Sequence, residues 1–202
     1  MSRTFYKFAL YFNILVTAVG MYYGYKYFQL GEKIVELPDY PNLFIIDQVL
    51  ILIAIGILLT YFHHKKFKHA FIVLVIATII SLFHFITGYT WLLGRPWGTL
   101  DQVSFLALTA SDLAFGVVLL YSNARTKPYL KKLGIVICIF LPVVIVLYII
   151  VISTTNAALR TTLSDTFRWI ELIGSFIPIL YVLHFFKEMN ETPLEDTAQL
   201  AR

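Results

Sequence analysis

Cysteine is almost absent from this sequence, because Cys138 is the only thiol in 202 residues. One thiol cannot form a disulfide within the chain or supply a multi-cysteine metal site. The sequence also lacks a Walker loop, a dinucleotide-binding fingerprint, a Gly-x-Ser-x-Gly elbow and a His-Glu-x-x-His zinc helix. It gives no signal for a metal or a cofactor, and we expect neither.

Charged residues are scarce as well. They make up 14% of the chain, against about 25% in a typical soluble domain. Hydrophobic residues reach 59% and the mean hydropathy is +0.77, which is more apolar surface than a soluble fold can cover. The net charge of +4 arises from short clusters between apolar runs, not from a basic face that would bind nucleic acid. We predict an all-α integral membrane protein that contacts membrane lipids and no nucleic acid.

Long apolar runs are abundant. A bilayer requires about 20 apolar residues per helix, and six such helices are predicted at 8–28, 43–62, 70–93, 101–121, 133–152 and 166–186. The first run continues through Tyr25, which is too long for the hydrophobic part of a signal peptide. We predict a six-helix transmembrane domain over residues 1–187 and a short, solvated acidic tail over residues 188–202, which begins at Glu188. No soluble domain is expected.

Basic residues are distributed unevenly between the connections. If the first helix starts in the cytoplasm, eleven Lys and Arg residues fall on the cytoplasmic side and five on the other, which fits the positive-inside bias. All three tryptophans, Trp91, Trp97 and Trp169, then fall at the outer boundary, where an indole sits at headgroup level. We predict that both termini are cytoplasmic, in a plasma or inner membrane.

Asp112 is the ionisable residue placed deepest in a predicted span. It lies roughly 16 Å along the fourth helix at 1.5 Å per residue, near the membrane midplane. An Asp at a helix centre costs about 2.5 to 3.5 kcal/mol on insertion, so it needs a partner or a wet cavity. Asp101 precedes it by three turns on the same helix face. Asp112 is therefore a candidate for binding or proton transfer, with a hydrogen-bonded structural role as the alternative.

Four other ionisable side chains are predicted toward the outer side of the bundle. His84 in the third helix can exchange protons near neutral pH. Glu171 and Arg168 lie one turn apart in the sixth helix, and Asp47 lies at a similar shallow depth in the second. If these helices face one another, they line an outward-opening polar cavity. The structural alternative is that shallow carboxylates favour a helix N-terminus and that the histidine joins two helices by a hydrogen bond.

Other features indicate packing. Asn13, Thr17, Gly20 and Gly24 form one stripe on the first predicted helix, and the two glycines permit close contact between helices. We expect that contact within the chain, with a homo-oligomer seam as the alternative. Pro142 and Pro178 are expected to bend the fifth and sixth helices. The tripeptide Asp-Gln-Val opens both the second and the fourth helices, which suggests a repeat of helical hairpins or a chance match.

Three hypotheses of function remain open. The first is transport or permeation of a small solute, an ion or a proton, with Asp112 as the deep site. The second is a non-catalytic subunit or scaffold that binds another integral membrane protein. The third is an intramembrane enzyme acting on a lipid, which requires His84 and an acid within about 3 Å of a substrate atom.

Overall fold

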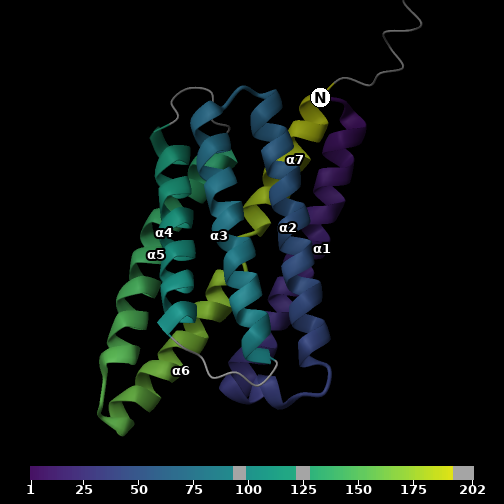
Figure 1. Cartoon of the computed structure of the whole chain (residues 1–202). Helices are drawn as coiled ribbons and strands as arrows, with labels where there is room; N and C mark the ends of the chain where they lie inside the picture. Colours follow the sequence, from purple (N-terminus) through teal and green to yellow (C-terminus); the bar gives the residue numbers. More distant parts are fainter. Residues whose placement is uncertain (93–98, 122–127, 193–202) are drawn as a thin grey trace, which may run out of the picture.

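The computed structural model describes residues 1–92, 99–121 and 128–192, apart from the side chains of residues 32, 35, 89–92, 101, 157, 158 and 160. All regular structure within these residues is helical (Figure 1). The elements in chain order are α1 (Arg3–Leu30), the 3-10 helix η1 (Gly31–Glu36), α2 (Tyr40–His64), α3 (Lys68–Leu92), α4 (Thr99–Tyr121), α5 (Pro128–Ser153), α6 (Ala157–Gly174) and α7 (Ile179–Glu191).

Six stretches of the described chain are long and apolar enough to cross a membrane. The first five lie in α1 to α5, and the sixth, Thr161–Glu191, combines α6 and α7. For the residues that the structure describes, the prediction of an all-helical chain with six long apolar helices is therefore confirmed. The first helix starts at Arg3, earlier than expected, because Ser2 caps it: the Ser2 hydroxyl accepts a hydrogen bond from the Phe5 amide at 3.2 Å.

The helices pack in a ring whose order follows the chain. Each of α1 to α4 lies against the next helix, α5 lies against both α6 and α7, and both of these lie against α1. Figure 1 shows the ring from the side of α2 and α3, with α1 on one flank and the α4–α5 pair on the other. The first and last helices of the chain are consequently neighbours.

The two ends of the ring hold different segments (Figure 1). One end holds Met1, the turn between α2 and α3, and the last turn of α7; we call it the N-terminal end. The Met1 ammonium lies 2.7 Å from Nε2 of His64 there. The other end, which we call the far end, holds η1 and the start of α2, where Pro41 occupies the first turn of the helix as proline favours.

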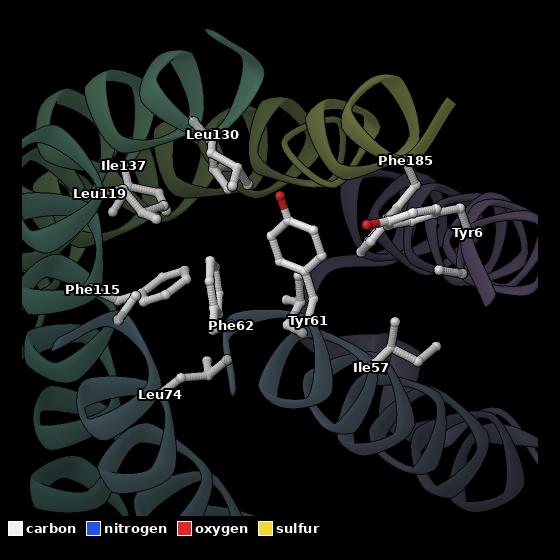
Figure 2. Packing of buried hydrophobic residues seen from close by; sticks show 14 of the residues in the cluster. Tyr6, Ile57, Tyr61, Phe62, Leu74, Phe115, Leu119, Leu130, Ile137 and Phe185 are labelled. Carbon is white, nitrogen blue, oxygen red and sulfur yellow. The ribbon is translucent and has the colours of Figure 1, made fainter. Parts of the chain in front are cut away.

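The buried apolar core is concentrated at the N-terminal end (Figure 2). Tyr61 and Phe62 of α2 are fully buried. The Tyr61 ring packs edge-on against Phe185 at 5.7 Å, and the Phe62 ring packs edge-on against Phe115 at 5.8 Å. These contacts join α2 to α7 and to α4, so aromatic side chains fill this end of the ring. The cluster comprises Tyr6, Ala9, Leu10, Ile57, Leu58, Tyr61, Phe62, Ala70, Leu74, Phe115, Leu119, Leu130, Leu133, Ile137 and Phe185.

The sixth span is interrupted between α6 and α7. Pro178 has no amide hydrogen to donate to the Gly174 carbonyl. The Ile177 amide bonds to that carbonyl instead, at 2.9 Å, and the Phe176 amide bonds to the Ile173 carbonyl at 3.1 Å. Bonds that reach back three residues instead of four tighten the chain into 3-10 geometry. The bend expected at Pro178 is thus a break that divides the span into two helices.

Candidate functional site

Three carboxyl groups from alternate helices of the ring form the candidate site. They belong to Asp47 of α2, Asp112 of α4 and Glu171 of α6, and each residue is half-buried. Over the described parts of the chain, none of the three accepts a hydrogen bond or forms an ion pair. Three acids without a polar partner in helices this apolar are costly unless something else contacts them.

The surroundings of these acids differ from those of their neighbours on the same helices. Asp112 and Glu171 are both partly buried against the rest of the protein. Trp169 and Ile173, two positions before and after Glu171, are by contrast 57% and 58% exposed on the outside of the bundle. The Glu171 side chain is therefore directed away from the outer surface of α6.

Two tyrosines connect two of the carboxyls at the far end. The hydroxyls of Tyr23 and Tyr40 lie 3.0 Å apart and share a hydrogen bond, which ties α1 to the start of α2. Asp47 and Glu171 both lie within electrostatic range of the Tyr23 hydroxyl, and Asp47 also lies within range of Tyr40. Carboxyl and hydroxyl oxygens from α1, α2 and α6 thus gather in one region. Oxygen groups of this kind suit a cation or a proton.

Asp112 interacts electrostatically with a different helix, α7. It lies within electrostatic range of the hydroxyl of Tyr181, in the first turn of α7. Both α4 and α7 lie against α5. The electrostatic interaction between Asp112 and Tyr181 therefore relates two helices that are not consecutive in the chain.

A second polar group lies at the N-terminal end, inside the aromatic core. Glu188 of α7 is 4% exposed. It accepts a hydrogen bond from the Tyr61 hydroxyl at 3.2 Å and another from the Lys65 ammonium at 3.1 Å. The Lys65 ammonium also lies 5.7 Å from the ring centres of Tyr6 and Tyr61, within cation–π range. The His184 ring packs edge-on against Tyr61 at 5.0 Å.

The environment of Lys65 favours its charged form. Partial burial acts to lower the pKa of the ammonium, but interactions with the Tyr6 hydroxyl and with Glu188 act in the opposite direction and outweigh it. The pKa of Lys65 is therefore raised from 10.5. The lysine stays protonated beside the buried carboxylate and compensates its charge.

His84, the histidine singled out in the sequence, joins two adjacent helices. Its Nδ1 lies 2.9 Å from the hydroxyl of Ser104 on α4, and that hydroxyl lies 3.2 Å from the hydroxyl of Thr87 on α3. Phe105 packs against the His84 ring at 6.2 Å. These contacts of His84 lie at the seam between α3 and α4.

Arg168 lies at the far end and, within the described chain, forms no ion pair with Glu171 or another predicted site residue. Its guanidinium is 3.6 Å from the carboxylate of Asp165. It also occupies the space beside Gly31, where the backbone has a φ of 57° that non-glycine residues rarely adopt. The side chain of Asp101 lies outside the described residues, as do Trp91 and Trp97, so their predicted positions stay predictions.

The small-residue stripe of α1 has two different surroundings. A Cβ at Gly24 would lie 2.9 Å from Cβ of Ser175, so α1 and the end of α6 approach closely there. A Cβ at Gly20 would meet nothing within 4 Å. Asn13 and Thr17 are buried, and their side chains bond to carbonyl oxygens of their own helix at 2.8 and 2.7 Å.

Sequence reasoning missed the group at the N-terminal end. It assigned Glu188 to a solvated tail, which is wrong: α7 continues to Glu191, and Glu188 is buried against Tyr61 and Lys65. The signal lay in the spacing of Tyr181, His184 and Glu188, which places them on one face of a helix. A polar stripe at helical spacing is a better guide than the first charged residue after an apolar run.

No group of three or more His, Cys, Asp or Glu side chains suited to a metal ion occurs among the described residues. No protein-family model matches the chain, and neither a curated protein nor a solved structure matches it. Its function is therefore argued from the site alone.

Proposed function

We propose that this chain is a multi-pass membrane protein that carries a small cation or a proton, with both termini in the cytoplasm. The observation that carries the proposal is the set of three carboxyls, Asp47, Asp112 and Glu171, which come from alternate helices of the ring and have no polar partner among the described residues. Acids inside a membrane mark ion pathways and proton relays, because their insertion without a partner is costly.

The sign of the site favours a positively charged substrate. The basic side chain of Arg168, one turn before Glu171, is directed to Asp165 and Gly31. The Tyr23–Tyr40 pair adds hydroxyl oxygens to the two carboxyls at the far end. We place the far end outside the cell, so that a cation meets Asp47 and Glu171 first and Asp112 at greater depth.

The orientation rests on the charges of the N-terminal end. Its two described acids on α7, Glu188 and Glu191, are paired with Lys65 and Lys187. The remaining lysines that the structure describes at this end are exposed and give it a positive surface, which is the bias of a cytoplasmic face. These exposed lysines are Lys7, Lys66, Lys68, Lys131 and Lys132.

Single-cysteine labelling tests the orientation. In a Cys138→Ser background, Lys66→Cys places a thiol at the N-terminal end and Asp39→Cys places one at the far end; both positions are exposed. With intact cells, a membrane-impermeant maleimide is expected to label the second variant and to leave the first unlabelled. The reverse pattern would show that the far end is cytoplasmic.

Flux through proteoliposomes tests the transport. The purified protein is reconstituted, and the uptake of Na⁺, K⁺ and H⁺ is measured with an imposed membrane potential. Asp112→Asn is expected to remove most of the flux, whereas Asp39→Asn, which changes an exposed acid outside the helices, is expected to leave it intact. Equal flux in wild type and Asp112→Asn would remove Asp112 from the pathway, and protein-free rates for all three ions would end the proposal.

A non-catalytic membrane subunit is the second candidate, and one observation favours it. The outer face of α5 is strongly apolar and has a shallow groove lined by Pro142, Val143, Val146 and Leu147. Such a face suits either lipid or the helix of a partner. A stoichiometric membrane partner that is lost on Val143→Trp, together with the absence of flux, would favour this candidate over transport.

A further inference from the structure

The outer face of α5 combines a basic start with a long apolar remainder. Lys131 and Lys132 lie near the beginning of the helix, at the N-terminal end, and both are exposed. The helix contains no Asp or Glu, and no basic residue follows Lys132 before the end at Ser153. From the lysines, α5 runs along one flank of the bundle toward the far end (Figure 1). Charge on this face is thus confined to one end.

A stripe of exposed aliphatic side chains follows Lys132 along the helix. Its members succeed one another at intervals of three or four residues, which is the spacing of a single helix face. Their exposed fractions range from 40% to 67%. The helix continues through Pro142, so the stripe is not interrupted. We call it the α5 stripe, and it consists of Ile135, Ile139, Val143, Val146 and Ile150.

The groove on α5 lies along this stripe, at a defined distance from the lysines. Its lining residues, from Pro142 to Leu147, follow Lys132 by ten to fifteen positions, which is about 15 to 22 Å along the axis at 1.5 Å per residue. A bilayer with its headgroups is about 40 to 45 Å thick, so about 20 Å separates a lipid phosphate from the bilayer centre. An acyl chain whose phosphate lies at Lys132 is therefore long enough to reach the groove.

The charges of the two lysines are not compensated by a carboxylate. Over the described parts of the chain, neither Lys131 nor Lys132 forms an ion pair. The Lys132 ammonium lies 5.5 Å from the centre of the Tyr129 ring, within cation–π range. Because Tyr129 and Lys132 are three residues apart, the ring holds the ammonium on the face that continues into the α5 stripe. The charge is thus in place for an anion from outside the chain.

We propose that the outer face of α5 binds one anionic glycerophospholipid from the leaflet at the N-terminal end. Lys131 and Lys132 hold its phosphate, and one acyl chain follows the α5 stripe into the groove. A phospholipid carries an anion and a long apolar chain in one molecule, with the separation that this face presents. The inference goes beyond the proposed transport and does not depend on the transported species.

A lipid suits this face better than the helix of a partner protein. Helices in membranes meet through small residues that allow their backbones to approach closely. The α5 stripe contains only Ile and Val, so a second helix would be held away from the α5 backbone. Basic residues beside a transmembrane helix attract the anionic lipids of the cytoplasmic leaflet. That leaflet is the one in which the proposed orientation places Lys131 and Lys132.

Native mass spectrometry of the whole chain in detergent tests the charged part of the site. The protein is titrated with dioleoylphosphatidylglycerol or dioleoylphosphatidylcholine, which share acyl chains and differ in net charge. We expect the first phosphatidylglycerol to bind more tightly. The double variant Lys131→Gln, Lys132→Gln should weaken its binding roughly 30-fold, the effect of two charges near an anionic surface.

A matched control separates a site from general attraction to a basic surface. The double variant Lys7→Gln, Lys68→Gln also removes two exposed lysines from the N-terminal end, but neither lies on α5. It should keep the wild-type dissociation constant for phosphatidylglycerol. Equal losses in the two double variants, or equal wild-type affinity for the two lipids, would overturn the site.

A second pair of variants tests the groove. Val143→Phe places a larger side chain in the groove and should weaken the binding of phosphatidylglycerol, while Ile76→Phe makes a similar change on α3 and should not. Both residues are nearly half exposed on the outside of the bundle, so both variants should elute like the wild type. Unchanged lipid binding in Val143→Phe would overturn the placement of the acyl chain.

The remaining outcomes identify other occupants. Glycerol 3-phosphate, which has the phosphate without acyl chains, should not displace the lipid; displacement would assign the lysines to a soluble phosphate and overturn the lipid site. A membrane protein that excludes the lipid and is lost in Val143→Phe would assign the face to a partner instead. Lipid binding is measured without flux, so a chain that binds the lipid and transports nothing would overturn the transport proposal alone.

Discussion

The Lys65 ammonium and the Glu188 carboxylate lie 3.1 Å apart, although 123 residues separate them in the chain. The pair joins the end of α2 to the last helix at the point where the aromatic core meets water. Glu188 is 4% exposed, so its charge depends on this partner and on the Tyr61 hydroxyl. Removing the lysine charge and removing the carboxylate charge should therefore change the stability of the protein by different amounts.

Lys65→Met should destabilise the protein more than Glu188→Gln does. The first variant removes the Lys65 ammonium from a buried carboxylate, while the second leaves a neutral amide and a partly exposed lysine. We expect a loss of about 2 kcal/mol for Lys65→Met, below the 3 to 5 kcal/mol of a wholly buried pair because the lysine is partly solvated. Thermal unfolding in detergent, followed by tryptophan fluorescence, measures the difference. A larger loss in Glu188→Gln would contradict this account of the pair.

The stability from Lys65 should depend on pH in one direction. Its pKa in the folded protein is raised above 10.5 despite partial burial, because Tyr6 and Glu188 favour the ammonium. A raised pKa stabilises the fold fully below the unfolded value and loses that effect as the pH rises through the folded value. The difference in melting temperature between wild type and Lys65→Met should be constant well below pH 10.5 and shrink above it. A difference that widens with alkaline pH would mean that burial dominates.

Two glycines of α1 should respond oppositely to the same substitution. A Cβ at Gly24 would lie 2.9 Å from Ser175, so Gly24→Ala forces α1 and α6 apart at a cost of about 1 to 3 kcal/mol. Gly20→Ala meets nothing within 4 Å and should be neutral or stabilise by up to about 1 kcal/mol through helix propensity. Thermal unfolding of the two variants side by side is the measurement. Similar losses in both would mean that Gly20 also lies in a tight contact.

Gly31→Ala should be destabilising for two reasons. The backbone φ of 57° is strained for alanine, at about 1 to 3 kcal/mol, and the added carbon would overlap the Arg168 guanidinium. Gly56→Ala is the control, because a Cβ at Gly56 meets nothing within 4 Å. In the double variant Gly31→Ala, Arg168→Ala, the loss of stability that comes from the steric overlap should disappear. The loss that comes from the strained backbone should remain. Full recovery of stability would show that the backbone is not strained.

The six spans were predictable because their signal is a property of composition. A bilayer demands about 20 apolar residues per helix, and the polar breaks of the chain divide it accordingly. The division of the last span was less visible, since Pro178 in a membrane helix can produce a kink or a break. Only the hydrogen bonds of the Phe176 and Ile177 amides, which reach back three residues, show which of these occurs.

The acids of the candidate site could be predicted from the sequence. The residues of other helices that lie near them could not. Asp112 and Glu171 stand out because charge is rare in apolar runs. Their relation to Tyr181 and Tyr23 depends on which helices meet across the ring, and tyrosine is too common near membrane surfaces to be singled out in a sequence. Glu188 was misassigned for a similar reason: a carboxylate at the end of a span looks solvated until its lysine partner, distant in the chain, is placed beside it.

The closure of the ring by α1 against α6 and α7 has a consequence for biogenesis. The ribosome synthesises α1 well before α6 and α7, so α1 is complete while more than 120 residues up to Ala157 are still being added, counted from Leu30. During that interval the α1 surface that will meet α6 and α7, Gly24 included, lacks these neighbours. Truncation before α7 would thus strand the earliest helix without the neighbour that completes its packing.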